Sequence, residues 1–244
     1  MGVGYQVSPL HRLVYLDMGD ARQRAIVPGE SRLLDALAYA RGMNSVTDEP
    51  VRTRSPTVER ILEWRQRLAT KYRDQLNEAL TWNERSTYET SDDVATSGDV
   101  LFHFAAAVLD QRGQAGLTDL IDQGRPPRDE MEPAFTEAER RGFGGRFPQL
   151  LLGANTWLPF QRNLMLEEPN WDGKMDRYGS VARLVDEITA VRGAIAEADP
   201  SVIRSLEDDV SSEKILSAAW QTSSPILRLA ALATAKHLPL LTTR

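Results

Sequence analysis

The chain has 244 residues, a formal net charge of −6 at pH 7 and no cysteine. This length suits one large domain or two small ones, and it allows a sizeable apolar core without cross-links. The lack of cysteine excludes disulfides, thiolate catalysis and cysteine-ligated zinc or iron–sulfur sites. The negative charge disfavours nucleic acid as a partner, because phosphate binding requires a basic face.

The N-terminal residues do not resemble a targeting signal. They lack a basic start followed by an unbroken apolar core, and no apolar run in the chain reaches about 18 residues. We therefore expect a soluble, cytoplasmic protein that does not enter a membrane.

The first fifth of the chain gives the weakest pattern. Val3, Tyr5 and Val7 alternate as in a strand, and a helix is slightly favoured for the apolar residues that follow within 1–28. Apolar residues at helical spacing then predict a helix over 31–41.

The next segments predict two long helices separated by a loop. Ser55 followed by Pro56 is a favourable helix start, and one apolar stripe predicts the longest helix of the protein, over 56–85. The acidic stretch 89–99 is rich in Ser and Thr and predicts a loop. Residues 99–109 are apolar on nearly every side, which is typical of a central buried helix.

Shorter helices are predicted over 115–123 and from Pro133 to Arg141. Ser180 is expected to cap a helix whose apolar residues follow each other at intervals of four and three. These residues are Leu184, Ile188, Val191 and Ile195.

Three more helices are predicted to stack antiparallel in the C-terminal part. They would open at Asp199–Pro200, at Ser211 and at Ser224–Pro225, and Ile203 is expected to face inward in the first of them.

Residues 142–180 form the one long stretch without helical periodicity. Three prolines interrupt it, and it holds six of the chain's 17 aromatic residues. Ordering so aromatic a segment requires that its rings be buried or bind something. We expect a structured insert around which the helices pack, with Trp157 and Phe160 anchored in the core.

The three histidines lack the spacings by which zinc or di-iron ligands share a helix face. His103 is therefore interpreted first as a core histidine, with a catalytic base as the less favoured alternative. The chain has no GxGxxG, Walker or GxSxG motif. The glycines of 142–145 are more typical of a helix C-cap and hinge than of a phosphate loop.

A candidate binding site lies late in the irregular segment, where four carboxylates surround a tryptophan. Trp171 stands in a charged, turn-forming context, so we expect it to be exposed and to act as an interface anchor. The carboxylates could also be solvated, bind a cation or supply a glycosidase-like pair, but their spacing matches no calcium loop. The candidate binding residues are Glu167, Glu168, Trp171, Asp172, Asp176 and Tyr178.

Two further acidic patches occur, one within 89–99 and one within 197–213. Each alone is typical of a solvated surface, but two patches on one face would attract a basic partner.

Together these patterns predict an all-α fold, a single domain of about eight or nine helices over 1–244. They favour a non-enzymatic, acidic protein-binding module with a basic protein partner and without cofactor or metal. A bacterial immunity protein that neutralises a toxin is one concrete case. The alternative is a small-molecule-binding protein or hydrolase with a pocket at 157–178, and a subunit of a larger assembly is a third possibility.

Overall fold

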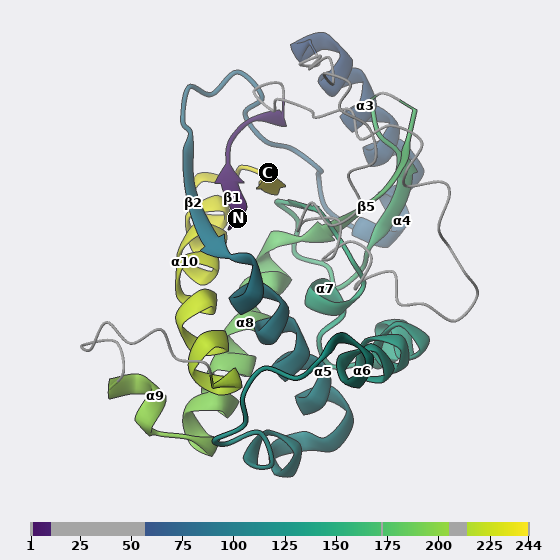
Figure 1. The fold of residues 1–244 in the computed structure, drawn as a ribbon. Helices are drawn as coiled ribbons and strands as arrows, with labels where there is room; N and C mark the ends of the chain where they lie inside the picture. The colour runs from purple at the N-terminus through teal and green to yellow at the C-terminus, as the bar shows by residue number, and fades with distance from the viewer. Residues whose placement is uncertain (1, 11–56, 172, 205–213, 244) are drawn as a thin grey trace, which may run out of the picture.

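The computed structural model describes residues 2–10, 57–171, 173–204 and 214–243. Within these residues the chain forms eight α-helices and a six-stranded mixed sheet (Figure 1). The predicted all-α fold is therefore wrong. The described helices also include none with the length and apolarity needed to cross a bilayer.

The sheet joins strands from both ends of the chain. Its order is β2-β1-β6-β3-β5-β4, and every neighbouring pair is antiparallel except β3–β5, which is parallel. The strands are β1 (Gly2–Val7), β2 (Thr90–Ala95), β3 (Thr156–Leu158), β4 (Leu166–Pro169), β5 (Met175–Ser180) and β6 (Leu240–Thr243).

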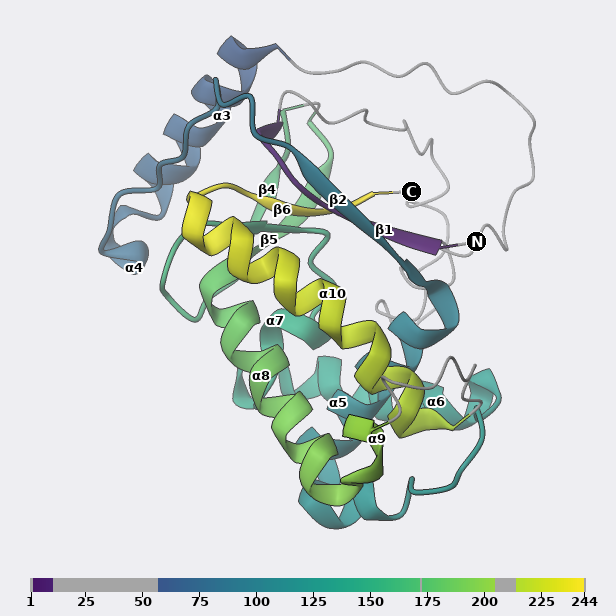
Figure 2. The same ribbon diagram turned by 90° about the vertical axis from the view of Figure 1, so that its left-hand side faces the viewer.

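Helices cover the sheet on both faces, with separate apolar clusters (Figure 2). The larger cluster lies between the sheet and α5 (Thr96–Thr118), α8 (Val181–Ala198) and α10 (Ile215–Lys236). The smaller cluster lies beneath α3 (Val58–Lys71) and α4 (Arg73–Leu76). The remaining helices are α6 (Arg128–Arg141), α7 (Pro148–Leu151) and α9 (Ser201–Arg204), with a 3-10 turn at Gly142–Gly144.

The strands escaped prediction because most are short and lack an alternating pattern. The predicted loop 89–99 contains edge strand β2, whose exposed side chains include Asp93. The three residues of β3 are all buried, so both of its faces are covered and no alternation is visible. Only the alternation of β1 gave a signal, and the strand predicted there is confirmed.

Several predicted helices also have different bounds. The helix predicted over 56–85 is capped by Thr57 and ends with α4 at Leu76, and α5 rather than α3 is the longest described helix. The segment 115–123 joins α5 across a kink at Gly113. α6 begins at Arg128 and contains Pro133 in its interior. The helix predicted over 31–41 lies outside the described residues.

Other helix predictions are confirmed by burial and capping. Residues 99–109 form the buried centre of α5. Ser180 caps α8 by accepting a hydrogen bond from the Arg183 amide, and the four residues of its predicted stripe are buried.

The described residues of the C-terminal part contain fewer helices than predicted. Residues 215–236 form one helix, α10, which continues through Pro225. α9 is a single turn, and Ile203 in it is 51 % exposed rather than inward-facing.

The contact between α5 and α10 depends on a glycine. A methyl group at Gly98 would overlap the Thr222 hydroxyl and lie 3.2 Å from Thr222 Cβ. Thr222 is itself buried on α10 and branched at Cβ, so it has little freedom to move aside. Gly193 in α8, by contrast, has open space where its methyl group would lie.

We predict that Gly98→Ala lowers the free energy of unfolding by about 1–3 kcal/mol, because it overpacks the α5–α10 contact. The matched control Gly193→Ala should raise it by about 0.5–1 kcal/mol, because alanine disfavours the unfolded chain. Urea unfolding of both variants checks this. Equal stabilisation by the two substitutions would contradict the close packing of these helices.

Candidate functional site: a groove beside Phe143

The residues predicted to form a binding site come from one hairpin. Glu167 and Glu168 lie in β4, Asp176 and Tyr178 lie in β5, and Trp171 lies in the turn between the strands. Asp172 is outside the described residues. The hairpin therefore brings the predicted residues near one another, but these residues differ in how far they are exposed to solvent.

Trp171 is not an exposed anchor. It is 6 % exposed, close to the 3 % of Trp157, and Tyr178 is fully buried. The Trp171 ring stands edge-on to Trp64 of α3 at a centroid distance of 5.4 Å. The interpretation of Trp171 as an exposed interface anchor is therefore wrong. The Trp64 ring that packs against it comes from α3, a helix distant in sequence.

The carboxylates of the hairpin are largely paired with bases. Glu167 accepts a hydrogen bond from Arg177 Nε at 2.6 Å, and Glu168 forms an ion pair with Lys71. Asp176 accepts a bond from the Arg177 amide at 2.9 Å. Within the described part of the chain, no group of three His, Asp or Glu side chains could hold a metal ion.

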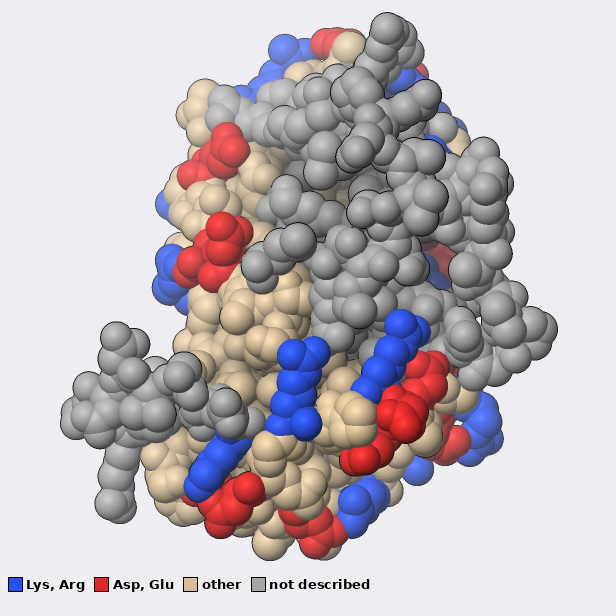
Figure 3. Space-filling view, viewed as in Figure 1, with Lys and Arg blue, Asp and Glu red and all other residues tan. Residues whose placement is uncertain are grey.

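The acidic patches that can be placed do not converge. The patch on β2 and the patch on β4–β5 lie at opposite edges of the sheet. Asp92 of β2 pairs with Arg228, and Asp99 is buried, where it accepts a bond from the Tyr5 hydroxyl. Figure 3 shows acidic and basic side chains interspersed over the lower part of one face rather than separated by sign.

A groove of about 670 Å³ lies between the end of α6 and the β4–β5 hairpin. Apolar and charged side chains both line it. They are Tyr72, Thr136, Glu139, Arg140, Gly142, Phe143, Leu152, Met165, Glu167 and Arg177. Phe143 is 47 % exposed, more than any other aromatic residue that the structure describes.

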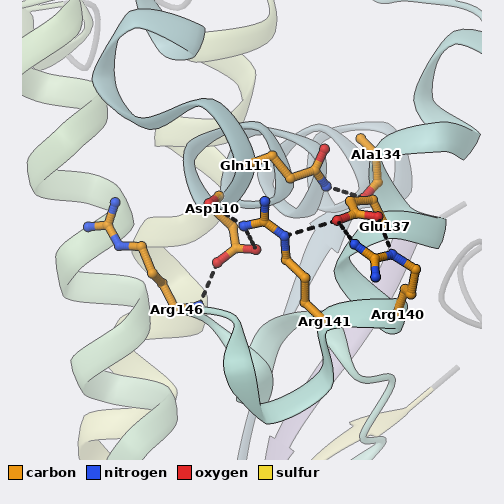
Figure 4. A network of polar contacts seen from close by, with 7 residues as sticks. All are labelled: Asp110, Gln111, Ala134, Glu137, Arg140, Arg141 and Arg146. Atoms are coloured by element: carbon orange, nitrogen blue, oxygen red, sulfur yellow. Dashed lines mark hydrogen bonds and ion pairs between the residues drawn. The ribbon is translucent and has the colours of Figure 1, made fainter.

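The turn that carries Phe143 is fixed by a buried carboxylate (Figure 4). The side chain of Asp110 is 1 % exposed and accepts a hydrogen bond from the Arg146 amide at 2.5 Å. Arg141 Nη1 donates to the Asp110 backbone oxygen at 2.9 Å and lies 3.3 Å from its carboxylate. A methyl group at Gly145 would lie 3.3 Å from both carboxylate oxygens, so glycine permits this close approach.

A second buried carboxylate, Glu187 of α8, holds the next few residues. It accepts hydrogen bonds from the Gln149 amide at 3.1 Å and the Leu150 amide at 3.0 Å. These amides lie in the first turn of α7, where a helix leaves its donors unsatisfied. At the other end of α7, Arg177 Nη1 donates to the Leu152 carbonyl at 2.7 Å.

Gln149 extends this support to the rest of the irregular segment. Its side-chain oxygen accepts from the Ser180 amide at 2.7 Å, and its side-chain nitrogen donates to Asn163 at 3.1 Å. Its backbone oxygen accepts from Trp157 Nε1 at 3.1 Å. The interpretation of 142–180 as a structured insert is therefore confirmed, as are the buried positions of Trp157 and Phe160.

The charged side chains on the α6 side of the groove form ion pairs with one another. Glu137 accepts two hydrogen bonds from Arg140, at 2.6 and 2.7 Å, and one from Arg141 at 3.1 Å. These bonds lower the pKa of Glu137 to about 2. The glycine-rich turn that follows is confirmed as a helix end, because Gly142 is the C-cap of α6 with φ +54°.

His103, Asp99 and Tyr5 are buried titratable residues that lie outside the lining of the groove. His103 is 6 % exposed, and its Nδ1 lies 2.8 Å from the Asp99 backbone oxygen, as expected of a core histidine. Burial and the neighbouring Asp99 raise the pKa of Tyr5. None of these three residues lines the groove.

A smaller pocket of about 270 Å³ lies on the other side of the hairpin, between α3 and the β4–β5 turn. Trp171 and Glu168 line it, with Trp64 and Arg67 opposite. Trp157, Phe160 and Tyr178, which belong to the segment 157–178 where the alternative function would place a pocket, do not line it.

The prediction of the site from sequence missed Phe143, although a signal was present. Its neighbours on both sides are glycines, which cannot cover an aromatic ring, whereas the neighbours of Trp171 suggested exposure without revealing α3. The groove also depends on Tyr72 and α6, which no local pattern connects to the hairpin.

Comparison with protein-family models gives no match, and comparisons with curated proteins and with solved structures also find nothing similar at a significant level.

We predict a pH dependence of stability that originates from Glu187. Burial raises its pKa to about 8 in the folded protein, against about 4.3 for an exposed glutamate. The folded state thus binds the proton more tightly, so this contribution to stability is complete below about pH 4 and is lost as the pH rises through 8.

Between pH 5 and 8 the wild type should lose about 3 kcal/mol of unfolding free energy from this group, and Glu187→Gln should not. Urea unfolding at several pH values measures the difference between the two proteins. Parallel pH profiles would show that Glu187 is already ionised in the folded state.

Proposed function

We propose that the protein is a non-enzymatic protein-binding module and that its partner docks in the groove beside Phe143. The observation that carries this proposal is an aromatic ring that is 47 % exposed on a firmly held turn. Exposing such a ring to water is unfavourable, and interfaces use rigid aromatic side chains as anchors that lose little entropy on binding. The proposal moves the anchor from Trp171 to Phe143.

The composition of the groove supports contact with a polypeptide. Leu152, Met165 and Tyr72 supply apolar surface, and the ion pairs Arg140–Glu137 and Arg177–Glu167 lie at its sides. An apolar centre with a polar surround is the usual anatomy of a protein interface.

We propose that the partner is basic, as expected from the net charge of −6. The acidic patches on β2 and on β4–β5 do not converge. The attraction would therefore act through the electrostatic field of the whole molecule, and it would accelerate the encounter with the partner rather than determine a local contact. A toxin-neutralising immunity protein remains one case within this class. A cytoplasmic location is part of the same proposal.

The test compares affinity capture from an extract of the native host by three proteins: wild type, Phe143→Ala and the control Met175→Ala. Met175 is 64 % exposed but does not line the groove. A partner retained by the wild type should be retained by the control, and its affinity for Phe143→Ala should fall at least about tenfold.

Both variants should unfold within about 0.5 kcal/mol of the wild type, since each removes an exposed side chain. If Phe143→Ala captured the same proteins with unchanged affinity, the groove would not be the docking site. Loss of capture by Met175→Ala alone would place the interface on the hairpin turn instead.

A further inference from the structure

A half-buried arginine on α8 has no acidic partner in the part of the chain that the structure describes. Arg192 forms no ion pair with any carboxylate among the described residues. α8 carries no Asp or Glu within one turn of Arg192, and α10, which packs beside it, carries none at all. In a protein with six more acidic than basic residues, a desolvated guanidinium without a carboxylate needs an explanation.

One nitrogen of Arg192 is engaged with α10. Nη1 donates to the Trp220 carbonyl at 2.8 Å and to the hydroxyls of Ser223 and Ser224 at 2.6 and 2.8 Å. This carbonyl lies just before the turn of α10 that contains Pro225. Proline has no backbone amide to donate within the helix, and it distorts the helix locally. Nη1 therefore braces α10 at its proline.

The guanidinium plane is also fixed. It lies over the Trp220 ring, with the guanidinium carbon 3.8 Å from the ring centroid. Stacking and the three hydrogen bonds from Nη1 hold the group in one orientation, so binding through its other nitrogens would cost little side-chain entropy. Burial lowers the pKa of Arg192.

The remaining edge, formed by Nε and Nη2, donates to no acceptor among the described residues. This edge presents two parallel N–H groups, the geometry that binds a carboxylate or phosphate in bidentate fashion. Figure 2 shows α8 and α10 side by side on a face of the molecule away from α3, and the Phe143 groove lies on other elements.

We propose that Arg192, stacked on Trp220, is a recognition site for an oxyanion, either a carboxylate or a phosphate group, that binds to its Nε–Nη2 edge. The site is independent of the groove beside Phe143 and of the function proposed for it. Its oxyanion complements a charge that no carboxylate among the described residues pairs with.

The test is a titration of the ¹⁵N-labelled full chain, in which the Nε–Hε NMR signal of Arg192 is followed. Sodium phosphate and sodium acetate are added separately, with sodium chloride adjusted to keep the ionic strength constant. The Arg192 signal should shift and saturate. The Arg140 signal is the internal control, because its Nε is already bonded to Glu137 at 2.6 Å.

Saturation by both anions supports recognition of the shared oxyanion chemistry, and saturation by one of them identifies its source. Trp220→Leu, which removes the stacking surface, should weaken the affinity by about tenfold while the Arg192 signal persists. An Arg192 signal that does not move, or that drifts without saturation together with the Arg140 signal, would overturn the proposal and leave Arg192 as a brace for α10.

Discussion

Two buried carboxylates organise the part of this protein on which the candidate site depends. Asp110 of α5 accepts the Arg146 amide, and Glu187 of α8 accepts the amides of Gln149 and Leu150. These amides belong to a turn and a one-turn helix that could not satisfy them alone. A carboxyl group that accepts backbone donors is costly to bury and stays buried only where the donors are well placed, so each helix and the segment it holds stabilise one another.

The arrangement links the fold to the proposed function. Because Asp110 and Arg141 hold the two ends of the glycine-rich turn, Phe143 remains exposed at the edge of the groove instead of folding into the core. Gln149 extends this hydrogen-bond network to β5, and Arg177 of β5 borders the groove from the opposite side. The anchor and the hairpin are thus positioned by one hydrogen-bond network, which suits a binding surface that is preorganised rather than formed on contact.

Local sequence patterns correctly predicted the features that depend on contacts between residues close in sequence. The stripe of α8 and its Ser180 cap follow from spacing and hydrogen bonding within a few residues. The sheet could not be predicted this way, because β1 and β6 pair across almost the whole chain and β2 carries aspartates along an exposed edge. Trp171 was misjudged for the same reason, since α3 covers it. Glu187 lies beside the predicted apolar stripe, but neither its burial nor its partners in α7 were predicted.

Hydrogen exchange of the Arg146, Gln149 and Leu150 amides tests the central claim most directly. Arg146 is an exposed residue in a turn, and the other two amides lie in the first turn of a very short helix, so without the carboxylates all three should exchange rapidly. Our account predicts that all three exchange as slowly as core amides of α5 and α8 in the wild type. It also predicts that Asp110→Ala accelerates Arg146, and that Glu187→Ala, which removes both acceptor oxygens, accelerates Gln149 and Leu150. Rapid exchange of these amides in the wild type would show that the carboxylates do not hold the segment and would contradict the account.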